Sequence, residues 1–489
     1  MTSTEGGALL VCITMLPVGG LLLAFLLGGR WAERVALLAL AIGAVVSFAI
    51  AAAVLRLDAA VVYLLGGWAP PLGVALRADG LSAAMLSTTS VVIGATAFFA
   101  RGRFGQGPGE QRQALVFWVL LLAVWSALNA VFVGTDLFNL FVALEMLSFA
   151  AIPLVCLDGR AETMAAALRY LIFVLFGSVL YLLGAALLYG AYGTLDITLL
   201  STRVKADPAT IVAGALMTAG LLAKTALFPL HLWLPAAHAG APAAASAVMS
   251  GLVVKASFIL ILRIWFWVMP GLLTGMAPQI LAALGAAAIV FGSALALRQA
   301  RLKLLIAYST VAQIGYLFLM FPLVAADPAH SGGPWTGGIL QAVSHALAKA
   351  SMFLAAGLVA ESVGHDRIRD LGGVARALPV TVVAFGLAGL SLMGLPPSGG
   401  FVAKWLLLKG AIATGQWWWA LVMLAGGLLT GGYVFRVLAV SLRARPSGAV
   451  FAAVAPRREA VVLVLALGSV ALGLVPLASF GLLQIGRLP

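Results

Sequence analysis

Long apolar runs recur along this chain and constrain its fold more than any other feature. Runs of at least about 18 residues, long enough for a helix to cross a bilayer, follow one another from residue 8 to residue 483. Hydrophobic residues make up 63% of the 489 residues and charged residues only 9%, which excludes a soluble globular protein and a disordered one. The chain is therefore predicted to be an all-α polytopic membrane protein without a large soluble domain.

The apolar runs predict about 14 transmembrane helices, of which the seventh and the twelfth are discontinuous. The predicted spans are 8–28, 32–55, 80–100, 114–133, 136–156, 163–191, 209–238, 243–268, 277–298, 301–321, 337–361, 378–413, 417–440 and 459–483. Between the second and third spans, the pairs Gly66-Gly67 and Pro70-Pro71 predict a small hairpin outside the membrane.

Basic residues are shared unevenly between alternate loops, and this asymmetry predicts the orientation. One set of loops holds Arg30, Arg34, Arg101, Arg103, Arg112, Arg160, Arg298, Arg301, Lys303, Arg367, Arg369, Arg376, Arg443, Arg445, Arg457 and Arg458. The alternate set holds only Arg56, Arg77, Arg203, Lys205 and Arg487. The positive-inside rule places the first set in the cytoplasm, so both termini are expected on the non-cytoplasmic side of the inner (cytoplasmic) membrane. The net charge of +13 is thus explained by topology, without nucleic-acid binding.

Two five-helix units are predicted, comprising helices four to eight and nine to thirteen. Their helix starts are offset by roughly 165–175 residues, and the fourth helix of each unit is the broken one. Because five is an odd number, the second unit must be inverted, as in transporters built from inverted repeats. The predicted division is an N-terminal three-helix region (1–112), the first repeat (113–268), the inverted repeat (277–443) and a C-terminal helix (457–489).

Each discontinuous helix combines a break with a lysine. Lys224 precedes the predicted break at Pro229, and Lys404 follows the predicted breaks at Pro396, Pro397 and Gly399. A broken helix at membrane depth is tolerated only where it lines a protected cavity, and a charge there is costly. Paired breaks in corresponding halves of the chain point to an ion pathway between repeats.

One acid, four lysines and one histidine lie at membrane depth, and each needs a polar partner or water. They are Glu145, Lys224, Lys255, His345, Lys349 and Lys404. Together they predict a hydrated polar axis, in which a Glu145–Lys224 pair would bind and release a proton as it opens and closes. Alternatively, Lys255 and Lys349 could extend their ammonium groups to the membrane–water interface, and His345 could form a hydrogen bond between two helices.

Three further polar residues are accessory candidates with structural alternatives. His231 and His238 flank the first break and could simply satisfy loosened backbone. Asp136 lies near the outer surface and could be a helix cap. Cys12 and Cys156 fall in apolar segments, and no nucleotide loop or catalytic triad is recognisable. No metal site and no cofactor are predicted.

Five stretches resemble the antiporter-like subunits shared by Mrp-type cation/proton antiporters, respiratory complex I and membrane-bound hydrogenases. They are DLFNLFVALE at 136–145, KTALFPLHLWLP at 224–235, HAGAP at 238–242 continuing to Lys255, HALAK at 345–349, and GLPPSGGFVAK at 394–404. The resemblance implies 14 helices with an inverted repeat over helices four to thirteen. It also implies that the six intramembrane residues named above form a proton path. Lys404, where one type of complex I subunit has a glutamate, resembles the D subunit of Mrp antiporters.

The expected function is that of a proton-translocating subunit in a multi-subunit Mrp-type Na⁺(K⁺)/H⁺ antiporter. One alternative is an antiporter-like proton-pumping subunit of a complex I-type NADH:quinone oxidoreductase or of a membrane-bound hydrogenase. Another is a non-conducting structural membrane subunit. The sequence favours a transporter subunit; within a redox complex it would be a translocase subunit without its own redox centre. Expected partners are other membrane subunits, H⁺, Na⁺ or K⁺, and the lipid bilayer.

Overall fold

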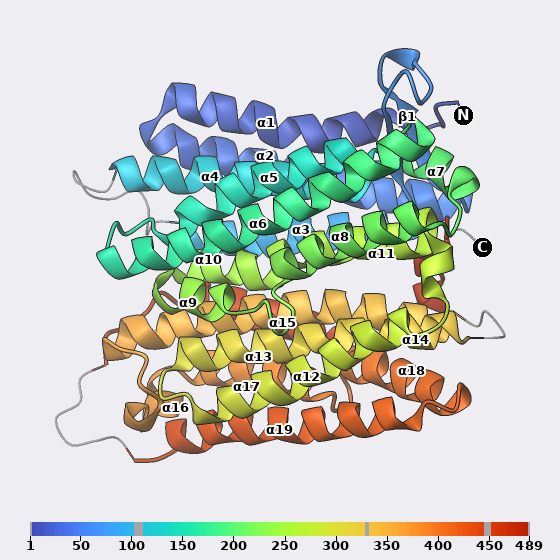
Figure 1. Cartoon of the computed structure of the whole chain (residues 1–489). Helices are drawn as coiled ribbons and strands as arrows, with labels where there is room; N and C mark the ends of the chain where they lie inside the picture. The colour runs from blue at the N-terminus through green and yellow to red at the C-terminus, as the bar shows by residue number, and fades with distance from the viewer. Residues whose placement is uncertain (1, 102–110, 328–331, 445–450, 488–489) are drawn as a thin grey trace.

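A bundle of long, nearly parallel helices makes up most of the molecule (Figure 1). The computed structural model describes residues 2–101, 111–327, 332–444 and 451–487. The two chain ends, the β-hairpin and the short helix α7 all lie at one end of the bundle. The N-terminal region contains α1 (Ala8–Leu27), α2 (Gly29–Leu57), β1 (Val61–Leu64), η1 (Leu65–Gly67), β2 (Ala75–Ala78) and α3 (Gly80–Ala100).

The remaining elements follow in two groups. The first group is α4 (Gln111–Val133), α5 (Leu137–Val155), α6 (Ala161–Tyr192), α7 (Ile197–Arg203), α8 (Pro208–Thr225), α9 (Trp233–Gly240), α10 (Ala243–Val248), the π-helical η2 (Met249–Val253), α11 (Val254–Arg263), the π-helical η3 (Ile264–Val268) and η4 (Pro270–Leu273). The second group is α12 (Ala277–Arg298), α13 (Leu302–Phe318), α14 (Met320–Ala325), α15 (Gly333–Val363), η5 (Ile368–Asp370), α16 (Val374–Ala377), α17 (Pro379–Met393), α18 (Gly399–Ala413), α19 (Trp417–Ser441), α20 (Pro456–Ala471) and η6 (Leu477–Gln484).

The predicted membrane architecture is confirmed. Among the described residues, twelve helices are long and apolar enough to cross a membrane. The other two predicted spans are the broken helix α17–α18 and the 16-residue α20. The predicted hairpin is also present, with Val61 paired antiparallel to Ala78. The inverted relation between the two five-helix units stays a prediction.

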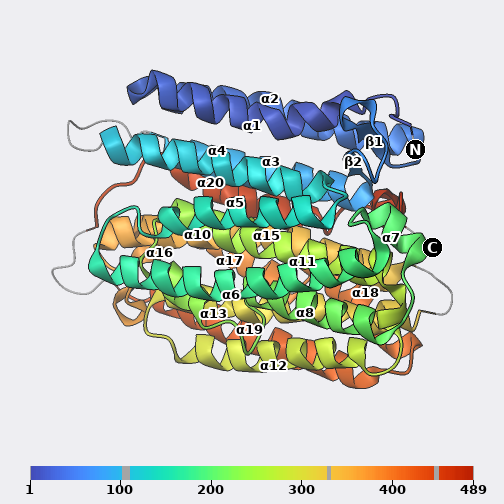
Figure 2. The same ribbon diagram turned by 45° about the horizontal axis from the view of Figure 1, so that its top comes forward.

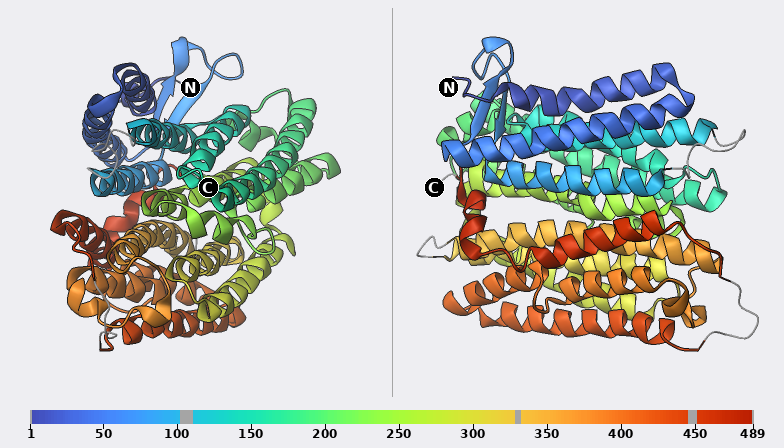
Figure 3. Two further views of the ribbon diagram at one scale, coloured as in Figure 1. Left: turned by 90° about the vertical axis from the view of Figure 1, so that its left-hand side faces the viewer. Right: turned by 180° about the vertical axis from the view of Figure 1, so that it is seen from behind.

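One local prediction was wrong, and one short helix was missed. The last span was expected to continue to residue 483, but α20 ends at Ala471, and η6 turns across the end of the bundle (Figure 3). Gly473 and Pro476 follow directly, and proline cannot continue a helix. The short helix α7, capped by Asp196, was not expected at all. Arg103 and Arg445, used in the topology prediction, lie outside the described residues.

Burial separates the central helices from the lipid-facing ones. The membrane windows of Ala243–Val268, Leu302–Ala325 and Gly333–Val363 are 100%, 89% and 94% buried, against 33% for α1, α2 and α19. In Figure 2, α1 and α2 form one edge of the bundle and α12 lies at the opposite edge. Large apolar side chains such as Leu38 and Leu428 are exposed on the outer helices, as suits contact with lipid.

Close packing of α6 against α8 depends on glycine. A Cβ atom on Gly177 of α6 would lie 2.5 Å from the carbonyl oxygen of Gly220 on α8, and the reverse distance would be 2.2 Å. Only glycine permits this approach of two backbones. The crossing holds α8, and therefore Lys224, against α6.

Candidate functional site

Glu145 and Lys224 form a buried ion pair between α5 and α8. The Lys224 Nζ atom lies 2.7 Å from Glu145 Oε1, and the lysine and glutamate side chains are 5% and 15% exposed. Ser178 of α6 donates to the same carboxylate oxygen, and Lys224 also donates to Ser148 Oγ at 3.4 Å. The structure thus brings together the two residues that the sequence predicted as a pair, and adds two serine hydroxyls to them.

The first helix break lies directly after Lys224. The helix α8 ends at Thr225, and Ala226 adopts a left-handed backbone conformation with φ of 58°. Pro229 lies within the irregular segment before α9. The Trp233 indole donates from Nε1 to the carbonyl oxygen of Ala223 at 2.9 Å, and the same oxygen accepts from the Ala226 N–H at 3.3 Å.

Lys255 is fully buried at the start of α11. Its ammonium donates to the carbonyl oxygen of Ser250 in the π-helical η2. A π-helical turn displaces backbone hydrogen bonds from the α-helical pattern, and such turns are frequent at functional sites. Ser257 of α11 accepts from Thr225 at 2.9 Å, so a hydroxyl pair joins the helix of Lys255 to the residue after Lys224.

His345 and Lys349 lie on one face of the central helix α15, as their spacing predicts. Lys349 is fully buried and donates to Ser309 Oγ and to the carbonyl oxygen of Ile306 (3.0 Å), both on α13. His345 is 1% exposed, and neither of its ring nitrogens has a hydrogen-bond partner among the described residues. Neither Lys255 nor Lys349 extends to the membrane–water interface, because both side chains are 0% exposed within the protein.

Lys404 forms a hydrogen bond beside the second helix break. It donates from Nζ to the carbonyl oxygen of Leu392 at 2.6 Å, in the last turn of α17, and lies 3.9 Å from the centre of the Tyr316 ring. Pro396 and Pro397 lie in the break itself. Gly399 was predicted to be part of the break, but it is the first residue of α18, whose N-cap is Ser398.

Of the three accessory candidates, Asp136 is a helix cap, and the two histidines stack on aromatic rings. Asp136 caps α5 by accepting from the backbone of Phe138 and Asn139, at 2.9 Å each. His231 lies beside the Phe228 ring at the first break. His238 is fully buried and stacks on Phe353, with no hydrogen-bond partner for either ring nitrogen among the described residues.

Sequence reasoning missed the polar groups of α13. Four of them are fully buried: Ser309, Thr310, Gln313 and Tyr316. Ser309 contacts Lys349, and Thr310 contacts Ser250. Gln313 donates to the carbonyl oxygen of Leu392, and the Tyr316 ring lies beside Lys404. Their recurrence along one predicted membrane helix was the available signal. Hydroxyl and amide side chains are common in membrane helices, however, so this signal is weaker than that of a lysine.

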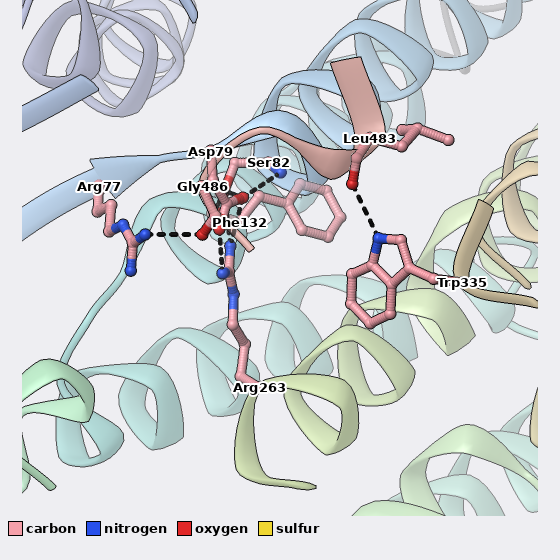
Figure 4. Close-up of polar contacts among 8 residues, drawn as sticks. All are labelled: Arg77, Asp79, Ser82, Phe132, Arg263, Trp335, Leu483 and Gly486. Atoms are coloured by element: carbon pink, nitrogen blue, oxygen red, sulfur yellow. Dashed lines mark hydrogen bonds and ion pairs between the residues drawn. The ribbon is translucent and has the colours of Figure 1, made fainter. Parts of the chain in front are cut away.

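A second buried ion pair, also missed, lies at the end of the bundle where both chain ends are found. Asp79, the N-cap of α3, receives two hydrogen bonds from Arg263 of α11, which also donates to Ser82 at 2.9 Å (Figure 4). Burial disfavours the charged form of Asp79, but the Arg263 guanidinium outweighs it and holds the pKa of this carboxyl below its usual value. The pair fixes one end of the helix that carries Lys255.

The C-terminal strap, residues 477–487, covers this ion pair. Arg77 donates to the carbonyl oxygen of Gly486 at 2.8 Å, and Trp335 of α15 donates to that of Leu483 at 2.8 Å. Figure 4 shows both contacts beside Asp79 and Arg263. The strap therefore joins the start of α15, the helix of Lys349, to the start of α3.

Comparison with known proteins identifies a matching family and several relatives. Residues 134–430 match the family described as NADH:quinone oxidoreductase/Mrp antiporter, transmembrane. NADH-quinone oxidoreductase subunit N of Desulforudis audaxviator is 37% identical over 381 residues, covering 77% of this chain and 74% of that protein. The D subunit of the Na⁺/H⁺ antiporter of Alkalihalophilus pseudofirmus is 30% identical over 369 residues, covering 75% and 73%.

A solved structure shares the whole fold. A chain in the Mrp complex from Dietzia sp. DQ12-45-1b superposes with a TM-score of 0.89 and 26% sequence identity. The superposition covers 99% of this chain and 97% of that one. The similarity thus extends beyond the matched segment to the N-terminal helices and the C-terminal strap.

Proposed function

Because the chain belongs to the NADH:quinone oxidoreductase/Mrp antiporter transmembrane family, we propose that it is the proton-translocating subunit of a multi-subunit Mrp-type Na⁺(K⁺)/H⁺ antiporter. The antiporter D subunit of Alkalihalophilus pseudofirmus and the Mrp complex of Dietzia support this assignment. The chain's partners are other membrane subunits, and the ions exchanged are H⁺ and Na⁺ or K⁺.

The observation that carries this proposal is the buried Glu145–Lys224 pair beside a helix break. An ion pair removed from water is costly, and such pairs inside membranes mark ion and proton pathways. Opening of the pair frees the lysine to release its proton, and closing favours uptake. The serine hydroxyls of Ser148 and Ser178 can take over hydrogen bonds while the pair opens.

The proposed path runs through the lysines in sequence order. The proton passes from Lys224 to Lys255, then by way of His345 to Lys349, and finally to Lys404. The Thr225–Ser257 hydroxyl pair supports the first step, and the contact of Lys349 with α13 supports the last. Two five-helix units, residues 113–268 and 277–443, would each supply one broken helix.

We place the molecule in the cytoplasmic membrane with both termini on the non-cytoplasmic side. The asymmetry of basic residues between the loops supports this orientation. The hairpin, the strap and the Asp79–Arg263 pair would then face away from the cytoplasm.

A second candidate function is proton pumping in a complex I-type redox enzyme. The 37% identity to NADH-quinone oxidoreductase subunit N favours it. In that complex, other subunits would carry out the redox reaction, and its energy would drive proton transfer through the same lysines. A non-conducting structural role is disfavoured because four lysines would be buried at membrane depth without use.

One experiment separates the two candidates. The complex is purified through this chain, its subunits are identified, and it is reconstituted into proteoliposomes with a pH-sensitive dye inside. The antiporter proposal predicts that a Na⁺ or K⁺ gradient alone drives proton movement. Proton movement that occurs only when a reduced cofactor and a quinone are supplied would replace the antiporter with the redox complex.

A further inference from the structure

Two polar rows face each other between Lys349 and Lys404. On α15, Gln341, His345 and Lys349 are four residues apart and therefore lie on one face. On α13, Ser309 and Gln313 are also four residues apart. Lys349 donates to Ser309 at one end of the rows, and Gln341 Nε2 donates to Gln313 Oε1 at 3.0 Å at the other. The rows therefore run antiparallel and are joined at both ends.

The Gln313 amide continues to the second helix break. Its Nε2 atom donates to the carbonyl oxygen of Leu392 at 3.1 Å, and this same oxygen accepts from Lys404 Nζ at 2.6 Å. Gln313 and Lys404 thus share one acceptor. At 1.5 Å per residue, Gln341 and Lys349 are about 12 Å apart along α15. Lys404 lies at the Gln341 end of the rows, so Lys349 is too far from it for a direct proton transfer.

Several buried polar atoms between these ends have no protein partner among the described residues. They are Gln341 Oε1 and both ring nitrogens of His345, on side chains that are 2% and 1% exposed. Buried polar atoms in proteins are paired with protein groups or with internal water. Because these atoms lie one turn apart on the same face of α15, a short chain of water molecules can satisfy all of them.

We propose that the amides of Gln341 and Gln313 position internal water that carries the proton between Lys349 and Lys404. A carboxamide stays neutral and cannot hold the transferred proton. The Lys349 ammonium gives a proton to the nearest water, each water passes one on, and the neutral Lys404 amine receives one. Both amides end unchanged, so they are positioning residues. This inference rests on the proposed proton path and adds the link that the lysines alone do not supply.

The test substitutes Gln341 in the assembled complex in proteoliposomes. Gln341→Leu keeps a side chain of similar size but removes both the Oε1 acceptor and the Nε2 donor to Gln313, and proton flux is expected to fall at least tenfold. Gln341→Glu keeps an acceptor oxygen, so flux is retained, with an additional titration in its pH profile. The matched control is Gln416→Leu, which removes another buried amide of the same half, donating to the Pro322 carbonyl oxygen at 3.1 Å; its flux stays near wild type.

Infrared difference spectroscopy supplies a second readout that does not depend on transport. In wild type, pH-induced difference spectra should contain a water band that shifts in H₂¹⁸O, and Gln341→Leu should lack it. Wild-type flux or an unchanged water band in Gln341→Leu would overturn the inference. So would equal loss of flux in the Leu and Glu variants with no change in pH profile. If wild type itself moves no protons, the proposed function fails, and the infrared band alone decides whether the water is there.

Discussion

At the residue scale, the four buried lysines, Lys224, Lys255, Lys349 and Lys404, are held by two kinds of hydrogen-bond acceptor. Among the described residues, only Lys224 of the four has its ammonium within ion-pair distance of a carboxylate. Lys255, Lys349 and Lys404 donate to backbone carbonyl or hydroxyl oxygens instead. Neutral acceptors stabilise an ammonium less than a carboxylate does, so the last three can release a proton without separating an ion pair.

Glu145→Gln tests this difference. The substitution keeps the shape of the side chain but leaves the Lys224 ammonium buried without an opposite charge, a situation that costs about 3–5 kcal/mol in buried pairs. We expect proton flux to fall at least tenfold, whereas Glu145→Asp, which keeps the charge, retains part of it. Flux equal to wild type across the pH range in the Gln variant would refute a role for the pair.

At the element scale, the helix breaks depend on particular small residues and donors. At the second break, a Cβ atom on Gly400 would lie 1.9 Å from the carbonyl oxygen of Ser391. At the first break, the Trp233 indole adds a second donor to the carbonyl oxygen of Ala223, which also accepts from the Ala226 N–H. The second break therefore holds Lys404 beside the carbonyl oxygen of Leu392, and the first break ends α8 one residue after Lys224.

Gly400→Ala should displace α18 from α17. Overpacking of this kind costs about 1–3 kcal/mol, and the shift would separate Lys404 from Leu392. We expect a lower melting temperature in detergent and loss of most proton flux. Gly190→Ala is the control, because a Cβ atom at Gly190 meets nothing within 4 Å. Wild-type flux in Gly400→Ala would show that the position of α18 does not matter.

The Asp79–Arg263 pair ties α3 to α11 and should make stability depend on pH. Because the pKa of Asp79 is lowered on folding, the pair stabilises the protein fully above the unfolded pKa of about 4 and loses this effect as pH falls further. Asp79→Asn should lower the free energy of unfolding by about 3–5 kcal/mol at pH 7, by leaving Arg263 unpaired. The melting-temperature difference from wild type should shrink below about pH 4. A constant difference at all pH values would contradict this explanation.

At the scale of the whole molecule, the sequence could predict most spans, both breaks and the four intramembrane lysines, because apolar length and intramembrane charge are strong signals. It could not predict the contacts of Gln313 or Ser309, since a neutral polar side chain fits many helix interfaces. The Asp79–Arg263 pair joins residues 184 positions apart, and only the folded bundle brings them together. The end of α20 was missed because its apolar run continues past the proline.

The predicted orientation is tested by labelling single cysteines. In a background where Cys12 and Cys156 are replaced, Asp58→Cys, before the hairpin, should react with a membrane-impermeant maleimide in intact cells. Arg369→Cys, in a basic loop, should react only after the cells are permeabilised. The opposite pattern would reverse the orientation and place the C-terminal strap in the cytoplasm.

The central claim is that one proton path uses all four buried lysines, and proton flux after a pH jump tests it most directly. Lys224, Lys255, Lys349 and Lys404 are each replaced by leucine, one at a time, in assembled complexes in proteoliposomes. Lys409→Leu is the control, because Lys409 is an exposed lysine on the same helix as Lys404. The path predicts that each of the four variants falls below about a tenth of wild-type flux, the size of effect expected when about 1.4 kcal/mol or more is added to the barrier. Lys409→Leu should stay near wild type, and wild-type flux in any of the four would contradict a single continuous path.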